Sequence, residues 1–187
     1  RCSTSENDQL AAIREQGFKP LKYFKCWESN QENYNNSKAI QFSKNNSELI
    51  WQELSRKNVE LLWNLEKSGE SSLLRQILDR KCSDLLDQNK LGSGVLTVNT
   101  GQEEEQALLG LITREEEKGG KTVQLLRDVG WDKRIESEIP RILMSLQRRY
   151  KKIILETDLD DENINKLIEE EGWTNTGENV LLGRSLW

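Results

Sequence analysis

The chain has 187 residues, of which 35% are hydrophobic and 32% charged, and its formal net charge is −5 at pH 7. This length suits one domain, or one domain with an appendage, and the acidic balance argues against a general nucleic-acid surface, which needs a basic face. The lack of histidine excludes His-based triads and His-ligated metals, and no apolar run approaches the roughly 20 residues that span a membrane.

The cysteines are few and scattered, at Cys2, Cys26 and Cys82. An odd and widely spaced set forms neither a disulfide framework nor a zinc site. We therefore expect no metal centre and a reducing, cytoplasmic setting for this protein.

The opening of the chain predicts a helix, a strand and a loop. Apolar residues at helical spacing, with Gly17 placed to end them, predict a short helix over 5–18. Residues 21–27 are rich in side chains that favour strands. The stretch 28–37 is polar, which is typical of a linker or an exposed loop.

The next part of the chain predicts a short strand and two helices. The strand is expected at 39–42. Leucine and isoleucine residues then recur at helical spacing from a cap at Ser47 to about Lys67. A second helix is expected over 71–91 for the same reason.

Three strands and a long helix follow. The strands are expected at 95–98, 107–113 and 123–126, the first two paired as a hairpin. Ser137 is expected to cap a helix that runs to about Tyr150, because Pro140 would then lie in its first turn, where a missing N–H is tolerated. A buried strand at 153–155 comes next, and it should run parallel to 123–126 because a helix connects the two.

The last part of the chain predicts a capped helix and a final strand pair. Asp160 or Asp161 caps the helix, and Gly172 followed by Trp173 ends it. Together the elements predict an α/β fold with a mixed sheet that is covered by helices.

This closing stretch resembles the C-terminal half of a GNAT N-acetyltransferase. Residues 167–173 are similar to the last helix of that superfamily with its glycine–aromatic stop, and 180–186 are similar to its closing strand. The element order from residue 39 is also similar to the full fold. The resemblance implies a GNAT-like domain, an acyl-CoA N-acyltransferase fold, over 38–187.

A weaker copy of the same unit opens the chain, with Gly17 and Phe18 matching Gly172 and Trp173. We interpret residues 1–30 as a helix–strand segment that resembles the end of a preceding GNAT-like unit. The chain would then be part of a tandem protein, or a domain with an N-terminal extension.

In GNAT enzymes, the loop before the long third helix holds the coenzyme A pyrophosphate on backbone N–H groups, and it carries an Arg or Gln followed by two closely spaced glycines. The matching stretch here is 130–138, in which Arg134 corresponds to the leading Arg. The following positions are Glu136, Ser137 and Glu138. Their side chains would crowd the backbone and their carboxylates would repel a diphosphate, so the motif is degenerate.

The resemblance also implies a set of site residues. Acetyl-CoA would contact Leu126, Trp131, Lys133, Arg134 and Ser137. Glu156, at the end of a central strand, would take the proton of an amine that attacks the thioester. The ordinary alternatives are that the two cations are solvated surface and that Glu156 faces solvent or caps the next helix.

Two further positions depart from the family pattern. Ile168 stands where many members have a tyrosine as general acid, and Asp161 stands where they have asparagine. Two functions are therefore compatible with the sequence. One is an acyl-CoA-dependent N-acetyltransferase with an amine substrate, and the alternative is an inactive GNAT-like module that binds a protein partner or a small molecule. Both require strands 123–126 and 153–155 to diverge and leave a slot beside the helix that contains Pro140.

Overall fold

The computed structural model describes residues 1–29, 49–70, 74, 81–88, 92–99, 105–116 and 120–184. In chain order, the strands of this part are β1 Cys2–Ser3, β2 Lys19–Ser29, β3 Leu49–Glu53, β4 Gly94–Asn99, β5 Glu105–Glu115, β6 Lys121–Arg127, β7 Ile153–Asp158 and β8 Trp173–Gly183. Its helices are α1 Asn7–Glu15, α2 Val59–Ser68, α4 Cys82–Gln88, α5 Arg134–Arg149 and α6 Glu162–Glu170. None of these helices is long and apolar enough to cross a bilayer.

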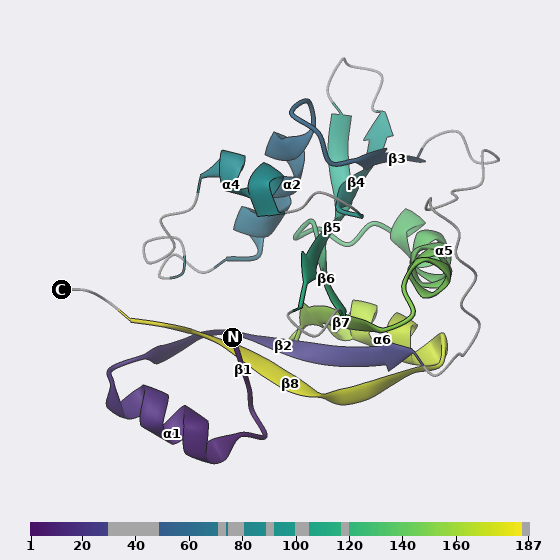
Figure 1. The fold of residues 1–187 in the computed structure, drawn as a ribbon. Coiled ribbons are helices and arrows are strands. Elements are labelled where there is room, and N and C mark those ends of the chain that lie inside the picture. The colour runs from purple at the N-terminus through teal and green to yellow at the C-terminus, as the bar shows by residue number, and fades with distance from the viewer. Residues whose placement is uncertain are drawn as a thin grey trace.

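The strands form one eight-stranded sheet in the order β1-β8-β2-β7-β6-β5-β4-β3. Neighbouring strands are antiparallel except for β6 and β7, which are parallel. The predicted α/β mixed sheet, the β4–β5 hairpin and the parallel pair are thus confirmed. Helices α5 and α6 lie on one side of the sheet, and α2 and α4 lie on the other (Figure 1).

Each face of the sheet has its own apolar core. On one face, α5 and α6 bury isoleucine and leucine side chains against β7, among them the fully buried Ile168. Isoleucine has no hydroxyl, and this side chain packs in the core, so it cannot act as the general acid that a tyrosine at this position would provide. On the other face, Leu62 and Leu65 of α2 pack against β5 and β6. They approach closely because Gly110 of β5 has no side chain, and a Cβ there would lie 2.5 Å from Leu62.

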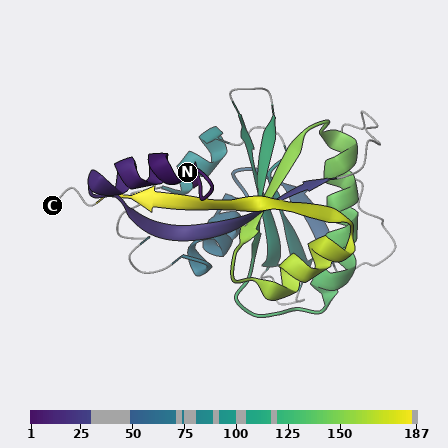
Figure 2. The same ribbon diagram turned by 90° about the horizontal axis from the view of Figure 1, so that it is seen from below.

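The N-terminal segment is built into the middle of the sheet. Strand β2 lies between β7 and β8 and is antiparallel to both. Phe24 and Trp27 of β2 are each only 1% exposed. Figure 2 shows β2 and β8 running side by side along the molecule. The boundary expected between 30 and 38 falls outside the described residues, and the origin of 1–30 in a preceding copy stays a prediction.

The expectation of one helix from Ser47 to Lys67 is wrong, because β3 and α2 occupy that stretch. Leu49 and Trp51 alternate along β3 and both pack against the core, which is strand periodicity, while Ile50 between them is exposed. Asn58 then turns the chain by accepting from the backbone N–H of Ser55 at 2.8 Å. The strand expected at 39–42 and most of the helix expected at 71–91 lie outside the described residues, although α4 falls within the latter.

Helix α5 begins at Arg134, three residues before the predicted cap. The carboxylate of Asp132 accepts a hydrogen bond from the backbone N–H of Arg134 at 2.9 Å and so caps the helix in place of Ser137. Pro140 therefore lies in the second turn, where it cannot donate to the carbonyl of Glu136. The expectation that Pro140 marks the first turn is wrong.

The C-terminal elements are largely as expected. The side chain of Asp161 accepts from the backbone N–H of Ile164 and caps α6, and Gly172 has a φ of +79°, which favours glycine at the helix end. The expectation of a final pair of strands at the end of the chain is wrong. A single eleven-residue strand, β8, follows Gly172, and its antiparallel partner on the inner side is β2 from the N-terminal segment.

Candidate functional site

The two parallel strands separate along their length. The ladder between β6 and β7 pairs Lys121 with Ile153 and ends at Gln124 and Glu156. Both strands continue beyond that point, β6 to Arg127 and β7 to Asp158. A slot therefore opens between them, on the side where α5 begins, and the backbone groups that face it have no partner in this ladder.

A buried hydrogen-bond network fixes the far end of β7 beside the slot. Trp27 of β2 donates to the hydroxyl of Thr157 at 3.0 Å. This hydroxyl lies 2.5 Å from the side-chain oxygen of Asn165 in α6. The amide nitrogen of Asn165 donates to the backbone carbonyls of Asp158 and Leu159, both at 3.1 Å. Because these groups are buried and paired, Asp158 keeps a defined position at the end of the strand.

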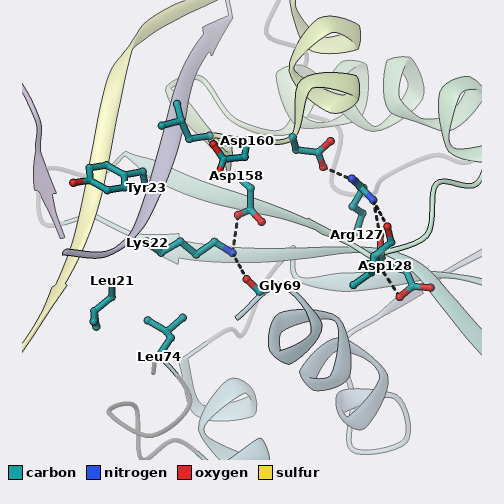
Figure 3. Close-up of a pocket in the computed structure, with 12 residues that line it drawn as sticks. Leu21, Lys22, Tyr23, Gly69, Leu74, Arg127, Asp128, Asp158 and Asp160 are labelled. Atoms are coloured by element: carbon teal, nitrogen blue, oxygen red, sulfur yellow. Dashed lines mark hydrogen bonds and ion pairs between the residues drawn. The ribbon is translucent and has the colours of Figure 1, made fainter. Parts of the chain in front are cut away.

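A pocket of about 440 Å³ opens where the strands part. Its walls come from β2, from Gly69 directly after α2, from Leu74, and from the ends of β6 and β7 with the residues that follow them. Figure 3 shows Lys22 reaching across it, between Asp158 and the backbone at Gly69. The ammonium group of Lys22 lies 2.7 Å from the carboxylate of Asp158 and 3.2 Å from the carbonyl oxygen of Gly69.

Half of the residues that line the pocket are charged, and most of these are carboxylates. Its cations are Lys22 and Arg127, and its carboxylates are Asp128, Asp158, Asp160 and Asp161. Arg127, the last residue of β6, forms an ion pair with Asp161 at the start of α6 and donates to the carbonyl of Asp128 at 2.7 Å. This ion pair joins the end of β6 to the start of α6 beside the pocket.

The predicted cofactor loop is occupied by its own side chains. Arg134 forms a bidentate contact with Asp132, with nitrogen–oxygen distances of 3.0 and 2.6 Å. The first three backbone N–H groups of α5 already have partners, which are the side chain and the carbonyl of Asp132 and the carbonyl of Lys133. Asp132 therefore holds the position at which a helix N-terminus would receive an external anion.

The other residues predicted to bind the cofactor do not line the pocket. Trp131 donates to the carboxylate of Glu136 at 3.2 Å and packs against the core. The side chain of Ser137 donates to the carbonyl of Arg134, and Lys133 is exposed. Leu126 is buried against α2. The structure thus gathers Trp131, Lys133 and Ser137 at the start of α5 and places Leu126 on the opposite face of the sheet.

Glu156 lies on the sheet face opposite α5 and α6 and is 1% exposed. Its carboxylate forms an ion pair with Arg1 and accepts from the amide of Asn179 at 2.9 Å. The alternative that Glu156 faces solvent or caps α6 is therefore wrong. Cys26 lies opposite Glu156 on β2, and burial raises the pKa of its thiol to about 11, so it stays protonated at neutral pH.

Several solved structures are similar to this chain in fold. A GCN5-related N-acetyltransferase from Sphaerobacter thermophilus matches 97% of this chain and 57% of its own, with 10% identity and a TM-score of 0.52. A Drosophila protein matches 98% of this chain and 59% of its own, with 12% identity and a TM-score of 0.54. A conserved protein of unknown function from Staphylococcus epidermidis matches 95% and 67%, with 15% identity and a TM-score of 0.52.

The chain has a GNAT-like fold. At these identities the likeness concerns the fold alone, and the chain spans less than two thirds of the length of the Sphaerobacter and Drosophila structures. No protein-family model and no curated protein matches the sequence. A shared fold does not fix an activity, which depends on the residues around the slot.

Sequence reasoning missed the residues that line the pocket of this GNAT-like fold. Arg127 and Asp158 had a readable signal, since each ends one of the two parallel strands, and the carboxyl ends of such strands commonly carry binding sites. Lys22 had none, because the N-terminal segment was assigned to another unit. Its place beside Asp158 depends on the insertion of β2 next to β7.

Proposed function

We propose that this protein transfers an acyl group from a coenzyme A thioester to an amine. The observation that carries the proposal is the separation of β6 and β7 beyond Gln124 and Glu156, together with the pocket that opens there. An extended pantetheine arm can hydrogen-bond to the backbone of a diverging strand as an added strand does. Its thioester would then reach the pocket between Arg127 and Asp158.

The charge of the pocket favours a basic acceptor. Four carboxylates and two cations line it, and the excess negative charge attracts a protonated amine. Before attack, the amine has to lose a proton, which Asp158 or a water molecule beside it would accept. The amine nitrogen then bonds to the thioester carbonyl carbon and the carbon–sulfur bond breaks. The nitrogen loses a second proton to the sulfur, so the products are an amide and the coenzyme as a thiol. Glu156 stays a second proposal for the base, since it is two residues away on the same face of β7.

A second candidate function is a non-catalytic binding module. The specific observation in its favour is Asp132, whose carboxylate already occupies the N-terminus of α5 and neutralises Arg134. A diphosphate could bind there only after Asp132 has moved away. The loop before α5 would therefore accept the diphosphate of coenzyme A only in a rearranged state.

Isothermal titration with acetyl-CoA tests the proposal directly. The proposed transferase predicts a binding isotherm at submillimolar ligand, and release of free thiol when a panel of primary amines is added. Binding without thiol release for any amine would favour the non-catalytic module. The absence of heat at millimolar acetyl-CoA would contradict the transferase.

A further inference from the structure

The guanidinium group of Arg1 is enclosed on the sheet face opposite α5 and α6. It forms an ion pair with the carboxylate of Glu156 in β7 and donates to the side-chain oxygen of Gln124 in β6 at 2.8 Å. It also lies 4.1 Å from the centre of the Phe24 ring in β2. The three surrounding side chains are between 1% and 3% exposed. Groups from three adjacent strands therefore surround one cation.

Each of these groups suits a guanidinium ion. A carboxylate and an amide oxygen accept its N–H groups, and an aromatic face attracts its charge. The carboxylate is held in place from outside the ion pair, because Asn179 of β8 donates to its other oxygen at 2.9 Å. Arg114 adds a second cation, which donates to Gln124 at 3.1 Å and lies 4.0 Å from Glu156. Pairing by both guanidinium groups explains how the sheet tolerates a buried carboxylate.

The segment that delivers Arg1 lies at the edge of the sheet. Strand β1 has two residues at the edge of the sheet and pairs with Asn179 and Val180 of β8. Thr4, which follows it, donates from its backbone N–H and its hydroxyl to the carbonyl of Glu178. Short edge elements open at low free energy relative to the rest of a fold. The side chain of Arg1 is also 22% exposed, so solvent reaches the guanidinium from one side. Opening of β1 would expose the enclosure without breaking a central strand pair.

We infer that Glu156, Gln124 and Phe24 form a receptor for a guanidinium group, and that Arg1 is its exchangeable internal occupant. A ligand with an arginine-like head group binds there in competition with Arg1. The receptor is a different site from the pocket proposed for acyl transfer, because none of its three side chains lines that pocket. It adjoins the slot, since Gln124 and Glu156 form the last pair of the β6–β7 ladder. It lies next to the pocket, because Glu156 and Asp158 are two residues apart on one face of β7, about 7 Å along the strand.

Methylguanidinium is the probe for this receptor. In Arg1→Ala the receptor is empty, and the ion is expected to raise the melting temperature by about 3–5 °C at tenfold excess over its dissociation constant. The wild type should show a clearly smaller rise at the same concentration, because the ion has to displace Arg1. The double variant Arg1→Ala/Glu156→Gln should show no rise, because it lacks the carboxylate. Sodium chloride at equal ionic strength is the control for screening.

The side-chain amide of Asn179 gives a local readout in Arg1→Ala, since it donates to Glu156. Its NMR signal should shift in a saturable way as methylguanidinium is added. If Arg1→Ala does not fold alone, recovery of the fold by methylguanidinium supports the receptor, and failure to recover overturns it. An unchanged melting temperature with an unshifted Asn179 signal also overturns it, as does an equal rise in the double variant.

Discussion

A single carboxylate, Asp132, decides how the start of α5 can be used. It accepts from the backbone N–H of Arg134 and binds the guanidinium of the same residue. These contacts stabilise the helix in the absence of a ligand, and they compete with any anion that approaches the same N–H groups. Ligand affinity and helix stability therefore depend on the same side chain, in opposite directions.

Asp132→Ala is expected to raise the affinity for acetyl-CoA about tenfold and to lower the free energy of unfolding by about 1 kcal/mol. The first effect follows from the freed N–H groups and the freed Arg134, and the second from the lost cap. Asp84→Ala is the matched control, because Asp84 accepts from the backbone N–H of Lys81 at the start of α4, away from the slot. It should lose similar stability without any gain in affinity. Titration calorimetry and urea unfolding measure the two quantities, and equal affinities for Asp132→Ala and wild type would contradict this role.

The stability difference between wild type and Asp132→Ala should also depend on pH. Hydrogen bonds from Arg134 hold the pKa of Asp132 below its ordinary value of 3.8. A carboxylate whose pKa is lowered by folding stabilises the fold above its ordinary pKa and loses this contribution as the pH falls through the lowered value. The difference in unfolding free energy should be constant above about pH 5 and should shrink below about pH 4. A difference that grows on acidification would contradict the assignment.

Asp158 is the residue whose loss should most affect the proposed chemistry. Asp158→Asn keeps its shape and removes the charge beside Lys22, so kcat/KM for the amine should fall about tenfold or more. Acetyl-CoA affinity should stay the same, because the amide still fits the pocket. Glu170→Gln removes an equal charge from the exposed face of α6 and should leave both quantities unchanged. A normal rate in Asp158→Asn would exclude Asp158 as the proton acceptor.

At the scale of elements, the sequence predicts a helix or strand best where the residues of that segment alone show its periodicity. The buried strands β4 to β7 and the capped helix α6 follow from short apolar runs and from Asp161. Strand β3 was misread as helix because its apolar residues continue at helical spacing into α2. The start of α5 was misplaced because Ser137 is an ordinary cap residue, whereas the cap contact of Asp132 depends on the loop before it.

The packing of α2 onto the sheet depends on Gly110 of β5. A methyl group there would lie 2.5 Å from a terminal carbon of Leu62 and 3.2 Å from one of Leu65. Gly110→Ala should therefore lower the free energy of unfolding by about 1–3 kcal/mol, through overpacking. Gly130→Ala is the control, since no atom lies within 4 Å of its added methyl group, and it should change stability by less than about 0.5 kcal/mol. Chemical denaturation of both variants measures the two losses of stability. Equal losses would contradict a special role for Gly110.

At the scale of the whole molecule, the main finding that sequence reasoning did not reach is the position of β2. Local pattern predicts a strand at 21–27 but not its partners, because register between distant segments is set by tertiary packing. Insertion of β2 beside β7 brings Lys22 to Asp158 and Trp27 to Thr157. The pairing of β1 with β8 places Arg1 over Glu156 and the ring of Phe24 in β2. The pocket and the guanidinium receptor therefore both depend on the N-terminal segment.

A substitution of Trp27 tests whether the N-terminal segment is an integral part of the fold. It is 1% exposed and donates to Thr157, so Trp27→Ala should lower the free energy of unfolding by about 3–5 kcal/mol. Tyr23→Ala, on the same strand but 38% exposed, should cost less than about 1 kcal/mol. Urea unfolding followed by far-UV circular dichroism measures both. A small loss for Trp27→Ala would mean that residues 1–29 are peripheral to the sheet.

The central claim is that the gap between β6 and β7 binds an acyl-CoA. Amide NMR during a titration with acetyl-CoA tests it most directly, because each residue beside the gap has its own signal. The account predicts saturable shifts at Leu125, Leu126 and Arg127 of β6 and at Thr157 and Asp158 of β7, with β3 unchanged at the far edge of the sheet. Shifts confined to other parts of the chain, or none at millimolar ligand, would contradict it.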